Sequence, residues 1–343
     1  MLKPNQKIVV YMEGHLRSDF GKMGHGVLRY SKNPIVGVID AQEKEEDLSS
    51  ILGYPTTIPI LESLEEGRSK GGEVLILGIA PSGGKIPESW HKMIQAAIAM
   101  GYSIVNGLHD LLCSQYEDQL SANQWIWDVR VPQSTPPIAS GKAKNLQNNR
   151  VLFVGTDMAS GKMTTALEVY KALLEEEKQV SFVATGQIGI TLTGAGIPLD
   201  AYKVDHACGS VEEAVLAAQE SDWILIEGQG SLLHPGSTAT LPLMRGSCPT
   251  HMILCIPAHH THLRNLPAYE IPPVQKIIQL NEIVASAAGN FPAAKVVGIA
   301  LNTSQLTAEA ALEKIQQISA ETGLPTTDPV RYSTQPLLEA LGI

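Results

Sequence analysis

The sequence predicts an α/β protein made of two doubly wound domains, each built on a parallel sheet. Short apolar runs rich in β-branched residues alternate with amphipathic segments of helix length, which is typical of parallel α/β architecture. The runs are continuously apolar, as expected for strands that are covered on both faces. At roughly 150 residues per domain, a chain of 343 residues has room for about two domains.

The first domain is predicted over residues 1–131. Its clearest helix runs from Glu88 to Met100, where apolar side chains recur at the spacing of one helix face. The predicted strands of this domain are Ile8 to Met12, Ile35 to Ile39, Val74 to Gly78 and Ser103 to Asn106.

The second domain is predicted over residues 150–343. Between the two domains, residues 132–149 lose periodicity and are rich in Pro, Ser, Gln and Asn, which predicts a linker. The first helix of the second domain carries a single apolar stripe from Ala166 to Leu174. The predicted strands are Arg150 to Gly155, Val180 to Thr185, Trp223 to Glu227, Met252 to Ile256 and Val296 to Asn302.

Charge and composition restrict the partners. The chain has 35 acidic and 25 basic residues, a net charge of −10 with His neutral, and only 5% of its residues are aromatic. An acidic chain without a basic run repels nucleic acid, and few aromatic side chains are present to stack on bases. We therefore expect small phosphorylated ligands and no nucleic acid.

The sequence also predicts a cytoplasmic protein. It contains no run of the roughly 18 apolar residues that a membrane span needs, and its first residues lack the apolar core of a signal peptide. The four cysteines form no CxxC pair, so we expect reduced thiols. A homo-oligomer is expected because symmetric assemblies are common.

The strongest motif is GTDMASGKMTT, between Gly155 and Thr165, which follows a strand and opens a helix. Its glycines let successive backbone N–H groups turn toward a phosphate, and the helix N-terminus adds a partial positive charge. Lys162 adds a full charge. The predicted phosphate-binding residues are Gly155, Thr156, Asp157, Ser160, Gly161, Lys162, Met163, Thr164 and Thr165.

Two departures from the standard P-loop bear on the ligand. Five residues separate the two glycines, where the standard loop has four, and this spacing resembles the G-T-D-x-x-x-G-K-T loop of dethiobiotin synthetase. Met163 stands where a Ser or Thr normally binds magnesium, and a thioether is a poor ligand for a hard cation. Thr164 and Thr165 point elsewhere on the helix. Phosphate binding is predicted, and magnesium is left as a possibility.

A second motif, WILIEGQG, places Glu227 at the end of a buried strand. It resembles the E-G-x-G of dethiobiotin synthetase, whose glutamate helps to hold magnesium, so the likeness implies a metal contact for Glu227. The alternative is a carboxylate that caps the next segment. Asp157 could assist through a water. Asn302 ends a strand where related folds read the nucleotide base, or is a plain cap.

Four segments together resemble one bacterial two-domain family. They are the phosphate loop and the stretches ATGQIGI (184–190), IEGQGSL (226–232) and GKMGHGVLRY (21–30). This family of formerly unknown function is sometimes labelled NAD-dependent epimerase/dehydratase, and some relatives are named D-glutamate N-acetyltransferases. The resemblance implies a Rossmann-like first domain and a P-loop NTPase-like second domain. Met163 belongs to the family pattern.

The resemblance implies N-acyl transfer to a D-amino acid such as D-glutamate. Coenzyme A carries phosphates that a P-loop can hold, so acetyl-CoA is one candidate cofactor. The likeness to dethiobiotin synthetase implies the alternative of ATP and Mg²⁺ activating a carboxylate or amine. A non-catalytic nucleotide sensor is the third possibility. The candidate catalytic residues are Glu227, Lys162 and His234, with Arg245 and Arg264 as further cations for an amino-acid-like substrate.

Two further features carry predictions of their own. In the first domain, a glycine-bearing loop after Gly14 and the strand-end Asp40 resemble a dinucleotide site, but the G-x-G-x-x-G fingerprint is absent. A Rossmann-like domain without a nucleotide is the alternative, and the loop Ser82 to Gly84 is a candidate ligand-facing segment. In the second domain, the cluster His259, His260 and His262 could bind a metal, contact substrate or phosphate, or simply be polar.

Overall fold

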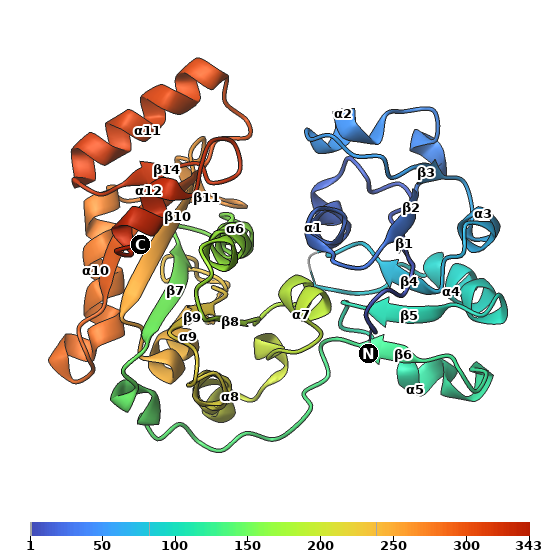
Figure 1. Cartoon of the computed structure of the whole chain (residues 1–343), viewed down its shortest axis with the longest axis horizontal. Coiled ribbons are helices and arrows are strands. Elements are labelled where there is room, and N and C mark those ends of the chain that lie inside the picture. The colour runs from blue at the N-terminus through green and yellow to red at the C-terminus, as the bar shows by residue number, and fades with distance from the viewer. Residues whose placement is uncertain (1, 82, 238) are drawn as a thin grey trace. The chain divides into compact units, whose positions relative to one another are not determined.

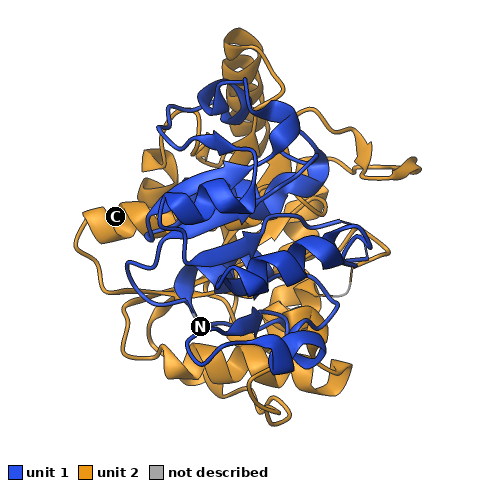
Figure 2. Cartoon of the chain, turned by 90° about the vertical axis from the view of Figure 1, so that its right-hand side faces the viewer, with its two compact units in different colours: residues 1–131, 187–198 blue, residues 132–186, 199–343 orange. Residues whose placement is uncertain are grey.

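The computed structural model describes residues 2–81, 83–237 and 239–343. Ser82, the first residue of the candidate ligand-facing loop, lies outside the described residues. The chain divides into two compact units, shown in different colours in Figure 2. Unit 1 comprises residues 1–131 and 187–198, and unit 2 comprises residues 132–186 and 199–343.

Unit 1 is built on a six-stranded parallel sheet in the order β3-β2-β1-β4-β5-β6 (Figure 1). This is the strand order of dinucleotide-binding folds, with the switch point between β1 and β4. The Rossmann-like prediction is confirmed. The strands are β1 (Ile8–Tyr11), β2 (Ile35–Ile39), β3 (Ile60–Leu61), β4 (Val74–Leu77), β5 (Ser103–Asn106) and β6 (Ile126–Asp128). The helices are α1 (Lys22–Tyr30), α2 (Leu48–Leu52), α3 (Leu64–Ser69), α4 (Trp90–Ala99), α5 (Cys113–Tyr116) and α7 (Gln187–Thr193).

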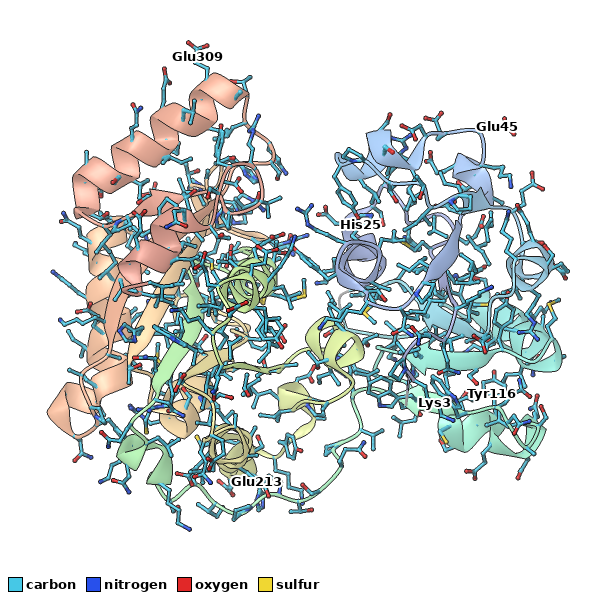
Figure 3. The ribbon with its side chains drawn as sticks, in the orientation of Figure 1. Lys3, His25, Glu45, Tyr116, Glu213 and Glu309 are labelled. Atoms are coloured by element: carbon cyan, nitrogen blue, oxygen red, sulfur yellow. The ribbon has the colours of Figure 1, made fainter. Side chains whose placement is uncertain are left out.

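The central strands of unit 1 are buried on both faces, which explains their continuous apolar sequence. On one face, Leu75 and Leu77 of β4 join a core with Ile94 of α4. On the other, the intervening Ile76 is equally buried. Near this sheet, His25 of α1, labelled in Figure 3, donates a hydrogen bond of 2.8 Å to Leu16 O, and burial lowers its pKa.

Unit 2 is built on a second six-stranded parallel sheet, in the order β14-β13-β10-β7-β9-β8, and carries a small antiparallel hairpin, β11–β12. The doubly wound prediction is confirmed. The strands are β7 (Asn149–Gly155), β8 (Val180–Val183), β9 (Trp223–Ile226), β10 (His251–Pro257), β11 (His262–Leu263), β12 (Leu266–Glu270), β13 (Lys295–Asn302) and β14 (Thr326–Thr327). The helices are α6 (Lys162–Glu175), α8 (Val204–Ala217), α9 (Thr240–Ser247), α10 (Val274–Ser286), α11 (Ala308–Thr322) and α12 (Gln335–Ala340).

Helices α6 and α12 share one core with the central strands of unit 2, in which Val169 and Leu337 pack with Phe153. At the opposite end of β7, Arg150 is buried, and its guanidinium donates to the backbone carbonyls of Leu146, Asn148, Ser247 and Cys248. Arg150 thus joins the start of β7 to the segments before β7 and after α9.

Residues 132–149 were predicted as a linker, and the structure shows that they pack on unit 2. The carboxylate of Glu212, on α8, accepts hydrogen bonds from the backbone N–H groups of Ser140 (2.7 Å) and Lys142 (2.5 Å). A Cβ at Gly209 would lie 1.7 Å from Pro137 O, so the segment runs directly against α8. A short polar sequence can therefore be ordered when a buried carboxylate satisfies its amides.

Residues 187–198 were predicted within the second domain, but they belong to unit 1, where α7 packs against α1. The chain therefore passes from one unit to the other after residues 131, 186 and 198. No helix in the described part of the chain has the length and apolar character required to cross a membrane.

Candidate phosphate-binding site

The predicted phosphate loop connects β7 to α6 at the carboxyl edge of the unit 2 sheet. Strand β7 lies between β9 and β10. The chain leaves β7 toward β8 on one side and leaves β10 toward β13 on the other, so the loop sits at the switch point of this sheet. Crevices at such points are where open α/β sheets bind ligands.

Lys162 is buried within its own loop. Its ammonium donates hydrogen bonds to Asp157 O (2.8 Å) and Ser160 Oγ (3.1 Å). Burial lowers the pKa of Lys162 to about 8, and the neighbouring thiol and carboxyl groups of Cys255, Asp157 and Glu227 oppose that shift. The loop thus holds its cation through one carbonyl and one hydroxyl oxygen, with which a phosphate oxygen would compete.

Two glycines let the Lys162 side chain pack closely beside β7 and β9, because a Cβ at either position would collide with its surroundings. A Cβ at Gly155 would lie 2.2 Å from Ser160 Oγ and 3.0 Å from Lys162 Nζ. A Cβ at Gly228 would lie 1.6 Å from Phe153 O and 2.9 Å from Lys162 Cδ. Gly161, with φ of 94°, adopts a left-handed conformation that favours glycine.

Glu227 follows β9, the strand paired with β7, and is therefore next to the loop. It is 2% exposed, and its Oε2 accepts hydrogen bonds from the N–H groups of Thr185 (2.9 Å) and Gly186 (3.1 Å). Burial raises the pKa of Glu227 to about 7, although these two donors and the charge of Lys162 favour the ionised form. A carboxyl group with this pKa can accept or release a proton near neutral pH.

The hydroxyl groups of the loop offer a poor magnesium site. Thr165 is buried and shares a hydrogen bond with the thiol of Cys255, so it faces the core. Met163 and Thr164 are half-buried on the first turn of α6. Thr156 Oγ1 is buried without a hydrogen-bond partner in the described structure. The described residues contain no group of three or more His, Cys, Asp or Glu side chains able to hold a metal ion.

Assistance to a metal through a water was one possible role for Asp157, and in the structure its carboxylate is bound by backbone amides. Oδ1 accepts from the N–H of Met158 (2.6 Å), and Oδ2 accepts from the N–H of Arg264 (2.5 Å). Asp157 is fully buried. It therefore fastens the hairpin β11–β12 to the phosphate loop.

His234 makes a second attachment to the same hairpin. Its Nδ1 accepts a hydrogen bond from the N–H of Gly236 (3.1 Å), so Nε2 carries the proton and donates it to Arg264 O (3.2 Å). Both ring nitrogens are thus used within the protein, which is the geometry of a positioning residue.

Asn302 ends β13 and lies beside the phosphate loop, with its Cβ 4.0 Å from the position of a Cβ on Gly161. Its Oδ1 accepts from the N–H of Ser304 (3.1 Å), as in a local turn. Asn302 therefore lies next to the phosphate loop and also forms a local turn.

The remaining candidates of unit 2 differ in their surroundings. The rings of His259 and His260 are in edge-to-face contact at 4.3 Å, and each has a buried Nδ1 without a hydrogen-bond partner in the described structure. His262 is exposed and contacts Glu270. Arg245 donates to Val284 O (2.9 Å) and lies over the ring of Phe291, so it joins α9 to the region of α10.

In unit 1, the residues that resembled a dinucleotide site make hydrogen bonds within the protein. The carboxylate of Asp40 accepts from the N–H groups of Gly14 (3.1 Å) and Leu16 (3.0 Å). The N–H of Gly24, in the first turn of α1, donates to Gly78 O (2.7 Å). A Cβ on Gly24 would lie 2.2 Å from Met12 Sδ. These contacts hold the glycine-bearing loop and Asp40 in place within unit 1.

Sequence reasoning missed two contributors to the site. The amides of Thr185 and Gly186 hold Glu227, and they lie in the stretch ATGQIGI that carried the family resemblance. The main chain of Arg264 binds both Asp157 and His234. No motif in the sequence predicts these contacts of Arg264, because the residues lie far apart along the chain.

Comparison with known families gives two matches. Residues 137–338 match the model of the DUF1611 P-loop domain, and residues 41–132 match that of the DUF1611_N Rossmann-like domain. Both are described as domains of unknown function.

Similar proteins are found among curated sequences and solved structures. A "D-glutamate N-acetyltransferase" of Tritonibacter scottomollicae is 38% identical over 285 residues, 81% of this chain and 84% of that protein. A protein of the same name from a Pseudoalteromonas species is 37% identical over 274 residues, 78% of this chain and 81% of its own length. The crystal structure of a DUF1611 family protein from Anabaena variabilis is 45% identical, with a TM-score of 0.95 over 98% of this chain and 99% of that one.

Proposed function

The chain belongs to the DUF1611 family of two-domain proteins, and from that premise we propose that it is an N-acyltransferase using acetyl-CoA to acylate a D-amino acid such as D-glutamate. The observation that carries this proposal is the name shared by two relatives, each more than a third identical over about four fifths of the chain.

The phosphate loop supports a phosphorylated cofactor. Gly155 and Gly228 leave room for the Lys162 side chain beside the loop, and its ammonium suits the oxygen atoms of a phosphate group. Thr156 Oγ1, buried without a partner in the described structure, is a further donor for such an oxygen. When bound, acetyl-CoA supplies the acetyl group as a thioester, a transfer that needs no metal ion.

Glu227 is the proposed general base. In the transfer, the amine nitrogen of the acceptor forms a bond to the acetyl carbon, the carbon–sulfur bond breaks, and a proton must leave the amine. A carboxylate whose pKa is about 7 can accept that proton at neutral pH. The amides of Thr185 and Gly186 hold its orientation. We propose that Lys162 binds phosphate and that His234 positions the hairpin.

One observation favours a second candidate function. Glu227 lies next to the phosphate loop, where it is well placed for chemistry on a phosphate group. In coenzyme A, by contrast, the long pantetheine arm separates the thioester from the phosphates. ATP-dependent activation of a carboxylate or amine is therefore the alternative. The cytoplasmic location, the oligomeric state and the amino-acid-like substrate remain predictions.

A binding and turnover experiment distinguishes these functions. We would measure the Kd of acetyl-CoA, of ATP with Mg²⁺ and of ATP with chelator, for the wild type and Lys162→Ala. The proposal expects acetyl-CoA binding that Lys162→Ala weakens, and metal-independent acetylation of D-glutamate that Glu227→Gln abolishes. Phosphate release that requires Mg²⁺ and an amino acid, without acetyl transfer, would support the alternative. If the wild type binds none of these ligands, the phosphate site is rejected.

A further inference from the structure

The phosphate loop has too little positive charge for the ligand proposed for it. Lys162 is its one basic side chain, and the carboxyl groups of Asp157 and Glu227 are both buried nearby. The N-terminus of α6 adds a partial charge equivalent to roughly half a unit. A pyrophosphate or triphosphate group brings several negative charges, so Lys162 and the helix together do not balance it.

In most P-loops a magnesium ion makes up the difference, but the usual ligand is missing here. Met163 occupies the position of the hydroxyl ligand, and the hydroxyl of Thr165 is turned to Cys255. The two Glu227 oxygens are bound by Thr185, Gly186 and Gln229. A second cation must therefore come from a side chain.

The geometry of the hairpin β11–β12 points to Arg264. Its N–H is bound by Asp157 at 2.5 Å, and its carbonyl is bound by His234 at 3.2 Å. The N–H and the carbonyl of Arg264 are thus both held in place, and the N–H is held by a residue of the phosphate loop. Leu263, the preceding residue, is buried at 4% exposure and fixes the hairpin further. The carbonyl of Asp157 in turn binds Lys162 Nζ at 2.8 Å.

We propose that Arg264 is a phosphate-binding residue that takes the place of the magnesium ion in this P-loop. This inference rests on the proposed phosphate site and adds the second cation to it. A guanidinium keeps its charge at every physiological pH and binds two phosphate oxygens at once. Asp157 and His234 are positioning residues that hold the main chain of Arg264 at the mouth of the loop. The ligand class is a nucleotide or coenzyme A bound without metal.

The test is ligand binding by the full chain in the presence of chelator. We would measure Kd by calorimetry for acetyl-CoA, ATP and inorganic pyrophosphate with the wild type, Arg264→Gln and Arg264→Lys. Arg264→Gln should raise Kd by about 10- to 100-fold, the range for losing charge-assisted hydrogen bonds. Arg264→Lys should recover only part of the loss, because its ammonium lacks the paired donors. Lys171→Gln, which removes an exposed cation of α6, is the control and should bind as the wild type does, with thermal melts verifying that each variant folds.

A double substitution tests the role of Asp157. Asp157→Ala releases the hairpin, so it should weaken binding in the wild type and have little further effect in Arg264→Gln. If the effects of the two substitutions on the binding free energy are fully additive, Asp157 is rejected as the residue that positions Arg264. Equal Kd values for Arg264→Gln and the wild type would overturn the inference and leave the phosphate site intact. If the wild type binds none of the three ligands, the phosphate site itself fails, and this inference fails with it.

Discussion

Lys162 and Glu227 place two proton-binding groups of opposite type at one buried site, and each has a pKa moved toward neutrality by burial. For Lys162 the ionised form binds phosphate, and for Glu227 the ionised form accepts a proton. The ionised form of Lys162 and the ionised form of Glu227 are both well populated only between about pH 7 and about pH 8. Acetyl transfer should therefore show a narrow pH optimum.

Ligand affinity should fall above pH 8. The pKa of Lys162 is about 8, so in the absence of ligand the ammonium loses its proton above that value, and an anion must then bind a neutral amine. We expect Kd to be constant near pH 7 and to rise by up to tenfold for each pH unit above 8. The measurement is calorimetric titration with acetyl-CoA between pH 7 and pH 10. Lys162→Arg keeps its charge throughout this range, so an identical rise in that variant would contradict the assignment.

Glu227 should reduce the stability of the folded protein at neutral pH. Its pKa rises from 4.5 to about 7 on folding, so the folded state holds this proton more tightly than the unfolded chain does. Between these two values the unfolded chain ionises first, and stability falls by up to about 1.4 kcal/mol per pH unit. Above pH 7 the loss is complete.

The variant Glu227→Gln tests this relation because it cannot ionise. Urea unfolding at pH 5, 6, 7 and 8 should give a stability difference between Glu227→Gln and the wild type that grows with pH up to 7 and then stays constant. The glutamine variant should be the more stable protein at pH 8. A difference independent of pH would show that Glu227 is not the group responsible.

At the scale of elements, the sequence predicted the long strands well and the short ones poorly. The strand ending in Asn302 is found at Lys295–Asn302, because its apolar side chains are buried on both faces. Strands β3 and β14 have two residues each, too few for a pattern. The hairpin β11–β12 was also missed, because most of β12 is exposed and Pro267 interrupts it.

The same limit applies to the site. The phosphate loop could be predicted because its chemistry depends on adjacent residues, from Gly155 to Thr165. The partners of Asp157 and His234 could not, because both bind the main chain of Arg264, and any residue type supplies an N–H and a carbonyl. Side-chain identity carries no signal for such contacts.

The segment 132–149 depends on one carboxylate of α8. Burial alone would raise the pKa of Glu212, but the amides of Ser140 and Lys142 and the Ser140 hydroxyl outweigh it, so its pKa is lowered. Glu212→Ala leaves those amides without an acceptor and should reduce stability by about 2–3 kcal/mol. Because the folded pKa is the lower one, this contribution is present above pH 4.5 and is lost as the pH falls below it.

Its neighbour Glu213, labelled in Figure 3, provides the matched control. Glu213 is exposed on the same helix, so Glu213→Ala should change stability by less than about 0.5 kcal/mol. Chemical denaturation of both variants at pH 7 is the measurement. Equal losses would mean that the effect of Glu212 comes from α8 and not from the segment that it holds.

At the scale of the whole molecule, the two units are not successive along the chain. Residues 187–198 leave unit 2 after Gly186, whose amide holds Glu227, and contribute α7 to unit 1. A cut between residues 131 and 132 therefore separates unit 1 from one of its own helices. The polypeptide links the folding of unit 1 to the backbone that holds the proposed base.

Loosening α7 should consequently affect unit 1 first. Ile190 is buried at 3% exposure, and α7 packs against α1 (Figure 1), so Ile190→Ala should cost about 2–5 kcal/mol. Hydrogen-exchange mass spectrometry should show faster exchange in α1 and, through Gly186, weaker protection around Glu227. Val169→Ala, on the buried face of α6, should instead increase exchange within unit 2 alone. If Val169→Ala also increased exchange in α1, the two units would unfold as one, and α7 would not belong specifically to the stability of unit 1.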